Sequence, residues 1–137
     1  MSENHELADW VRREMTVERG DILARSKERV SKILGITPQG QVEFRISADG
    51  QSRLNARDKV LLYALGKLYS NVAGYAADEA VSSIEFVTGL GIPRGTVDRT
   101  LKELRESHQL NAVRKGVHSL PTNRVPEVLT EIERRIA

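Results

Sequence analysis

Positively charged side chains gather in one short part of this sequence. Residues 89–118 contain six lysines and arginines against three acidic residues, whereas the whole chain of 137 residues carries a net charge of only +2. Residues 1–55 and 119–137 are each balanced, and residues 56–88 carry −1. Localised positive charge attracts phosphate groups, so residues 89–118 are the first candidate for a binding site. A basic cluster of this size is also compatible with a solvated face, and charge alone does not decide between the two.

No catalytic or metal-binding constellation stands out. The chain has no cysteine, which excludes thiol catalysis and cysteine-ligated zinc. Its histidines, His5, His108 and His118, are far apart and have no carboxylate at ligand spacing. Gly89-Leu90-Gly91 is not followed by the Gly-Lys-Ser/Thr of a phosphate loop. We therefore expect a protein that is not an enzyme and that uses no metal and no other cofactor.

Length and composition bound the class of protein. With 39% hydrophobic and 29% charged residues, the chain is expected to be soluble and globular, with one ordinary domain or a small domain and a helical extension. No apolar run is long enough to cross a membrane. The polar N-terminus lacks the apolar run of a signal peptide, so we expect a cytoplasmic protein without a membrane partner.

The N-terminal part carries two amphipathic helical patterns. The first is short and the second runs to Leu34, where Gly35 is a plausible stop. Whether residues 5–34 form one helix or two stays open, because Gly20 weakens a continuous helix. The apolar residues of the two patterns are Leu7, Trp10, Val11, Met15, Ile22, Leu23, Val30, Ile33 and Leu34.

A strand pattern follows the loop at Pro38 and Gly40. Residues 41–47 alternate strictly between apolar and polar, which predicts a half-buried strand, closed by a turn at Asp49-Gly50. A lone strand leaves its backbone groups unpaired. It must therefore pair with another strand of this chain or with one in a second subunit.

The strongest helical pattern begins after Asn55, a good N-cap, and Gly74 with the residues after it ends it. Ser82 and Glu85 then have the spacing of a capping box and open a short helix. Two glycines in Gly89-Leu90-Gly91 favour a turn. After Ile92-Pro93 a second helix begins, and its predicted buried residues are Val97, Leu101 and Leu104.

A short helix, a glycine turn and a second helix describe a helix-turn-helix. Residues 91–104, GIPRGTVDRTLKEL, resemble the turn and recognition helix of winged helix-turn-helix transcription regulators. Two predicted strands, 109–114 and 117–120, stand where that family has its wing. Their Lys115-Gly116 centre suits a tight hairpin imperfectly, which predicts a longer or bulged wing. Apolar residues after Pro126 predict a last helix.

The resemblance covers about residues 55–137. It implies a mainly α fold with a small β component, in which a winged helix-turn-helix domain follows an N-terminal extension of helices and one strand over residues 1–54. It also implies sequence-specific binding of double-stranded DNA by a transcription regulator, with the recognition helix in the major groove and the wing on the backbone.

Helical geometry then assigns candidate DNA contacts. With the apolar residues of the second helix facing inward, its basic residues face outward. The N-terminal end of this helix would reach base edges, the wing would touch the backbone or minor groove, and the serines at residues 82 and 83 would bind a phosphate through backbone N–H groups. The candidates are Ser82, Ser83, Arg94, Gly95, Thr96, Arg99, Lys102, Arg114, Lys115 and His118.

Two alternatives accompany this interpretation. The basic residues are also compatible with a solvated face, with Arg99–Glu103 and Lys102–Glu106 as ion pairs one turn apart. The rival function is a winged-helix module for protein–protein interaction or assembly. It would use residues 1–54 as its binding element and would not read DNA.

The N-terminal apolar residues also predict a homodimer, held mainly by the first 50 residues. Their side chains provide more apolar surface than a small winged helix needs to cover itself. The strand over 41–47 would pair across a two-fold axis. Symmetry would also lengthen the DNA site to a palindrome. The competing arrangement folds the N-terminal helices back on the rest of the chain, with the strand joining the wing sheet.

Overall fold

The structure, a computed structural model, describes residues 3–16 and 18–137. It is mainly helical with a small antiparallel β component, as the sequence predicts. Within the described residues, no helix combines the length and the apolar character needed to cross a membrane. In chain order the elements are α1 (Glu3–Glu14), α2 (Arg19–Ile33), β1 (Leu34–Ile36), β2 (Val42–Phe44), α3 (Ala48–Ser52), α4 (Ala56–Val72), β3 (Val81–Ser82), α5 (Ser83–Leu90), α6 (Arg94–Glu106), β4 (Asn111–Arg114), β5 (Val117–Ser119), the 3-10 helix η1 (Thr122–Arg124) and α7 (Val125–Ile136).

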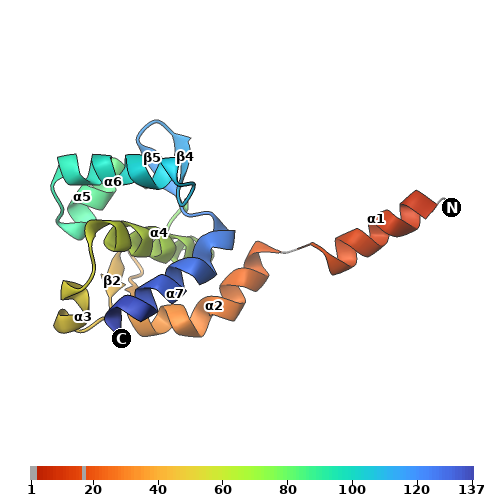
Figure 1. Cartoon of the computed structure of the whole chain (residues 1–137), viewed down its shortest axis with the longest axis horizontal. Coiled ribbons are helices and arrows are strands. Elements are labelled where there is room, and N and C mark those ends of the chain that lie inside the picture. The colour runs from red at the N-terminus through yellow and green to blue at the C-terminus, as the bar shows by residue number, and fades with distance from the viewer. Residues whose placement is uncertain (1–2, 17) are drawn as a thin grey trace.

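The first helix, α1, stands apart from the rest of the molecule (Figure 1). It ends at Glu14, and α2 begins only at Arg19, so the N-terminal apolar patterns form two helices and not one. The large apolar side chains of α1 and of the residue after it remain exposed: Leu7, Trp10, Val11 and Met15. None of the described residues outside α1 covers this face.

In contrast, α2 packs against the body of the protein. Arg29 forms an ion pair with Glu133 of α7, with a shortest N–O distance of 2.6 Å. The apolar side chains of α2 and the start of β1 enter the same core as those of the C-terminal helices, and the buried ones are Leu23, Val30, Ile33 and Leu34. The core is therefore continuous across the division predicted near residue 54.

The predicted strand has its partner in the segment directly before it, which the sequence prediction missed. β2 is shorter than the predicted 41–47 and pairs antiparallel with β1, with Leu34 opposite Phe44. Gly35 consequently lies inside β1 and does not end the preceding helix. The chain reverses between the strands where Gly40 takes a φ of +84°, a conformation that glycine adopts without steric cost.

The predicted turn at Asp49-Gly50 is also wrong, because these residues lie in the short helix α3. The hydroxyl of Ser47 accepts the N–H of Gly50 and caps this helix. Gly50 is buried, and a Cβ at this position would lie 2.6 Å from the side chain of Ile46. The glycine therefore permits close packing.

The central helix α4 begins and ends as predicted. The Asn55 side chain accepts the N–H of Asp58, and the Asp58 carboxylate accepts the N–H of Asn55, which completes a capping box. After the helix, Gly74 takes a φ of +79°. Most residues in the first part of α4 are buried, among them Val60, Leu61, Leu62, Leu65 and Leu68.

The two short helices α5 and α6 follow the predicted pattern with one change. The hydroxyl of Ser82 accepts the N–H of Glu85 and caps α5, but the carboxylate of Glu85 binds Lys67 and does not return to the cap. Only half of the predicted capping box is therefore formed. Gly91 takes a φ of +66° and ends α5, and Pro93 is the N-cap of α6.

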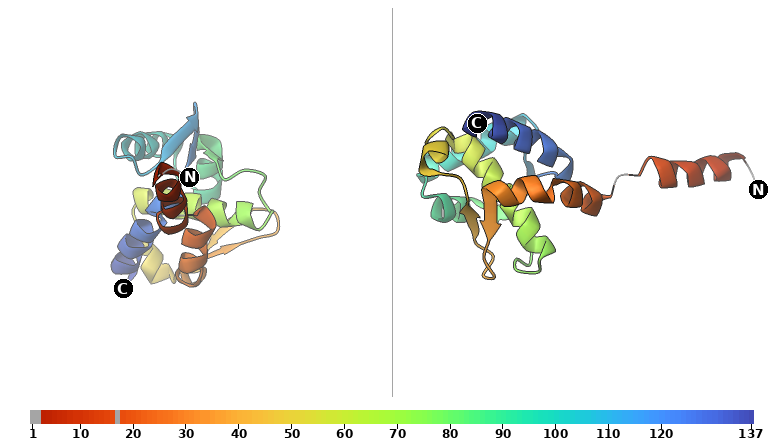
Figure 2. Two further views of the ribbon diagram at one scale, coloured as in Figure 1. Left: turned by 90° about the vertical axis from the view of Figure 1, so that its right-hand side faces the viewer. Right: turned by 90° about the horizontal axis from the view of Figure 1, so that it is seen from below.

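The hairpin of β4 and β5 lies beside α6 (Figure 1 and the left view of Figure 2). Its turn at Lys115-Gly116 places Gly116 at a φ of +73°. The register shifts between Ala112 and Arg114, so the predicted irregularity of this hairpin is present as a bulge. β3, which the sequence did not indicate, pairs with β5 and makes it the middle strand of a three-stranded sheet.

Candidate nucleic-acid interface

The orientation of α6 confirms the predicted helical phase. Its inward face contributes fully buried side chains to the core, namely Val97, Leu101 and Leu104. Arg94, Arg99 and Lys102 are exposed, as predicted for the outer face, and Thr96 is half-buried. Gly95 is exposed, and a Cβ built on it would meet nothing within 4 Å. The N-terminal half of α6 is therefore open to a large partner.

The N-terminus of α6 differs from the starts of its neighbours. Its N-cap, Pro93, makes no side-chain hydrogen bond to the helix, and its first turn contains no acidic residue. The preceding helix, α5, has a side-chain cap, Ser82, and an acidic residue in its first turn, Glu85. The first N–H groups of a helix lack intrahelical partners and carry a partial positive charge. An anion at this end of α6 would be stabilised by these groups.

Five exposed cations on α6 and the hairpin take part in no ion pair among the described residues. They are Arg99, Lys102, Arg105, Arg114 and Lys115. The alternative ion pairs predicted along the helix, Arg99–Glu103 and Lys102–Glu106, are not formed within 4 Å between these described residues. These cations are therefore not neutralised within the chain.

A groove of about 380 Å³ separates α6 from the β4–β5 hairpin. Cationic side chains from both elements line it, joined by one carboxylate, that of Asp98. The cations are Arg94, Arg105, Arg114 and Lys115. The hairpin follows α6 directly in the chain and lies beside it, so these side chains form a positively charged concavity. A polyanion fits such a concavity electrostatically.

His118 is not a surface contact, contrary to the sequence prediction. Its side chain is 2% exposed and lies beneath the hairpin, where its Nε2 is 2.9 Å from a terminal nitrogen of Arg105. Burial, and then the charge of Arg105, hold the pKa of His118 below its usual range. The neutral ring connects β5 to α6 and does not reach the surface.

Arg105 is the residue that sequence reasoning left out of the candidate list. The sequence indicates it only as one of the basic residues that are compatible with a solvated helix face. In the structure it is exposed, lines the groove and contacts the ring of His118. No local pattern signals this position, since the contact depends on how the sheet packs against the helix.

The proposed phosphate site at Ser82 and Ser83 is also corrected. Ser83 is 8% exposed, and both its N–H and its hydroxyl donate to the carbonyl oxygen of Gly116, at 2.9 and 3.3 Å. The hydroxyl of Ser82 is engaged in capping α5. These polar groups therefore hold the turn of the hairpin in place and are not available to a phosphate in the predicted way.

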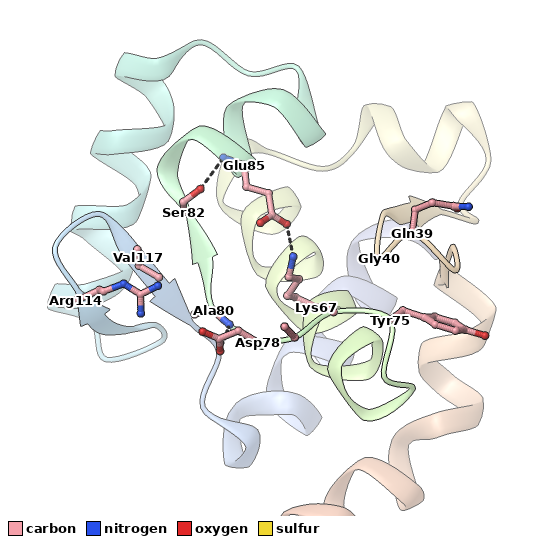
Figure 3. A pocket seen from close by; sticks show the side chains of 12 residues that line it. Gln39, Gly40, Lys67, Tyr75, Asp78, Ala80, Ser82, Glu85, Arg114 and Val117 are labelled. Atoms are coloured by element: carbon pink, nitrogen blue, oxygen red, sulfur yellow. Dashed lines mark hydrogen bonds and ion pairs between the residues drawn. The ribbon is translucent and has the colours of Figure 1, made fainter.

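A second hollow, of about 350 Å³, lies on the other side of the hairpin (Figure 3). In it the ammonium group of Lys67 points toward the carboxylate of Glu85, with 2.7 Å between Nζ and Oε2. The hydroxyl of Tyr63 donates to the same oxygen, and burial and this carboxylate raise the pKa of Tyr63. The pair joins α4 to α5, and its opposite charges compensate each other.

Neither this hollow nor the groove shows the donor set of a metal site. Among residues 3–16 and 18–137, no group of three or more histidine and acidic side chains is placed to hold a metal ion. In comparisons with known proteins, the chain matches no protein-family model, no curated protein and no solved structure.

Proposed function

We propose that this chain binds double-stranded DNA through a winged helix-turn-helix and acts as a transcription regulator. In this proposal α5 and α6 form the helix-turn-helix, and the β4–β5 hairpin is the wing. The observation that carries the proposal is the set of exposed cations on α6 and the wing, of which Arg105, Arg114 and Lys115 line one groove without an ion pair among the described residues. A face of this kind attracts the phosphates of a duplex.

The proposed geometry places α6 in the major groove. Its uncapped N-terminal end would approach base edges, and the bare Cα of Gly95 would allow the helix backbone to come close. Arg99 and Lys102 would contact the duplex along the outer face of α6. Arg114 and Lys115 would contact the phosphates beside the groove. Thr96, half-buried, would contribute only its exposed part.

The test is an equilibrium binding measurement on the full chain with duplex DNA at two salt concentrations. We expect binding that weakens steeply with salt, and an Arg94→Ala/Arg99→Ala variant that binds at least about tenfold more weakly. The matched control is Arg25→Ala/Lys27→Ala, which removes the same charge from exposed residues of α2. Figure 1 and Figure 2 place α2 across α4 from α6.

Two results would reject DNA binding through α6. One is the absence of any salt-dependent affinity for duplex DNA, which would favour the rival interaction module. The other is unchanged binding by the Arg94→Ala/Arg99→Ala variant, which would remove α6 from the interface. Equal losses in this variant and in the α2 control would indicate only a general effect of net charge, and they too would reject the proposed interface.

We also propose that two copies associate through α1, so that two recognition helices read a two-fold symmetric site. This proposal is narrower than the sequence expectation. The apolar residues of α2 are buried in their own chain, and β2 pairs with β1, so β2 does not require a strand from a second subunit. The exposed apolar face of α1 supports the association, since a symmetric contact would cover it in both copies.

A further inference from the structure

Arg94 has an acidic partner, unlike the other basic residues of α6. Its Nε lies 3.6 Å from Oδ2 of Asp98, one helical turn away. Both side chains are more than half exposed, at 59% and 53%. An exposed pair of this kind contributes little to stability, because water screens it and both side chains lose freedom. The pair is therefore available for another role.

The contact of this pair is at Nε of Arg94, 3.6 Å from the carboxylate, so it does not depend on the two terminal nitrogens of the guanidinium. These two nitrogens are the donors that a bidentate contact to O6 and N7 of guanine requires. The attraction at Nε favours orientations of the guanidinium that keep Nε beside Asp98. Asp98 is thus placed as a positioning residue for Arg94.

Asp98 has a second possible contact of its own. A carboxylate on a recognition helix accepts a hydrogen bond from the exocyclic amino group of cytosine. The two Cα atoms are about 6 Å apart along the helix axis, but the charged ends converge to 3.6 Å. This distance is close to the spacing of adjacent base pairs, about 3.4 Å. Both side chains line the groove beside the wing, which keeps their ends on one side of α6.

The charge of Asp98 argues for selectivity as well. A carboxylate among the cations of this groove repels phosphates, so it weakens binding to DNA in general. Its presence is unfavourable for a surface that only attracts a polyanion. It is favourable for a surface that must reject duplexes lacking the matching bases.

We infer that Arg94 and Asp98 act as one unit that selects G·C base pairs, with Arg94 donating to a guanine and Asp98 accepting from a neighbouring cytosine. This inference rests on the proposed DNA binding and names the bases that α6 prefers. The full chain should select, from a pool of random duplexes, sites that share a guanine with a cytosine at an adjacent base pair, on either strand. Replacing these G·C pairs by A·T should weaken binding about tenfold or more.

Two variants of matched charge test the inference. Asp98→Asn and Glu103→Gln each remove one negative charge from an exposed position of α6, but only Asp98 faces Arg94. We expect Asp98→Asn to bind unrelated DNA more tightly and to lose most of the preference for G·C, leaving about a twofold ratio. Glu103→Gln should keep the preference. Arg94→Lys should also lose it, because an ammonium group cannot make the bidentate contact.

The outcomes separate the inference from the proposed function. Salt-dependent duplex binding without any G·C preference would overturn the inference and leave DNA binding intact. A preference that survives Asp98→Asn, or that Glu103→Gln abolishes equally, would overturn it as well. Absence of duplex binding would reject both proposals. Thermal unfolding of each variant shows whether a loss reflects the contact or the fold.

Discussion

A terminal nitrogen of Arg105 lies 2.9 Å from Nε2 of His118, so a buried ring of β5 is joined to the helix that bears the exposed cations. Arginine can only donate, and Nε2 must therefore accept. The ring proton is then on Nδ1, a buried atom with no hydrogen-bond partner among the described residues. The ring is held in its neutral form between two elements of the proposed DNA interface.

This contact predicts a dependence of stability on pH. Burial and Arg105 lower the pKa of His118 in the folded protein, so the unfolded chain takes up the proton first as the pH falls. Stability should therefore decrease from about pH 6.5 downward, by at most about 1.4 kcal/mol per pH unit from this group. Urea unfolding of the full chain between pH 5 and about pH 8 measures the slope.

A pair of variants isolates this slope. His118→Gln should remove the contribution of His118 to the slope below about pH 6.5. It should also lower the stability at all pH values, because the residue is buried. His108→Asn, which changes an exposed histidine with a positive φ, should leave the slope unchanged. If His118→Gln kept the full slope, another group would be responsible.

The inward face of α6 should be essential for folding. Leu101 is 1% exposed, and Leu101→Ala should lower the free energy of unfolding by about 2–5 kcal/mol, the usual cost for a buried leucine. Ile84→Ala, at a 55% exposed position of α5, is the control and should cost far less. Chemical denaturation checks both, and similar losses would contradict the orientation of α6.

A substitution at Gly95 should change stability and DNA binding in opposite directions. The residue lies in α6 with open space around it, so Gly95→Ala should raise the free energy of unfolding by up to about 1 kcal/mol. The added methyl group should nevertheless weaken duplex binding, because it stands between the helix backbone and the DNA. Denaturation and duplex titration of the same preparation test this, and unchanged affinity would place Gly95 outside the interface.

The wing should contact phosphates and not bases. Lys115→Ala should weaken binding to selected and unrelated duplexes by similar factors, and it should reduce the slope of log affinity against log salt by about 1. Titrations at four or five salt concentrations give this slope. A loss confined to the selected sequence would instead assign Lys115 to base reading.

The proposed dimer depends on the apolar face of α1. Leu7→Ser/Val11→Ser in the full chain should convert a dimer into a monomer at tens of micromolar, as measured by light scattering. Ile84→Ser/Val113→Ser removes exposed apolar side chains outside α1 and should leave the dimer intact. A monomeric parent chain would reject the proposal, and a dimer that survives the α1 substitutions would move the contact to another surface.

The sequence by itself determined the elements whose signals are local. Asn55 and Ser82 cap α4 and α5 because the residue types and the three-residue spacing suffice for a capping bond. The buried face of α6 follows from a period that any isolated helix would share. The turn centre at Lys115-Gly116 predicts an irregular hairpin, and the register of β4 and β5 shifts between Ala112 and Arg114.

Tertiary structure decided which strands pair and which of their side chains face inward. The hairpin of β1 and β2 was missed because the apolar run ending at Leu34 continues the helical pattern without a break. In the sequence pattern of the strand, His118 occupies a position that an exposed wing residue would also occupy. It is buried because β3 makes β5 a middle strand that packs on α6, where Arg105 meets its ring. Strand order depends on contacts between distant segments, and no local spacing records them.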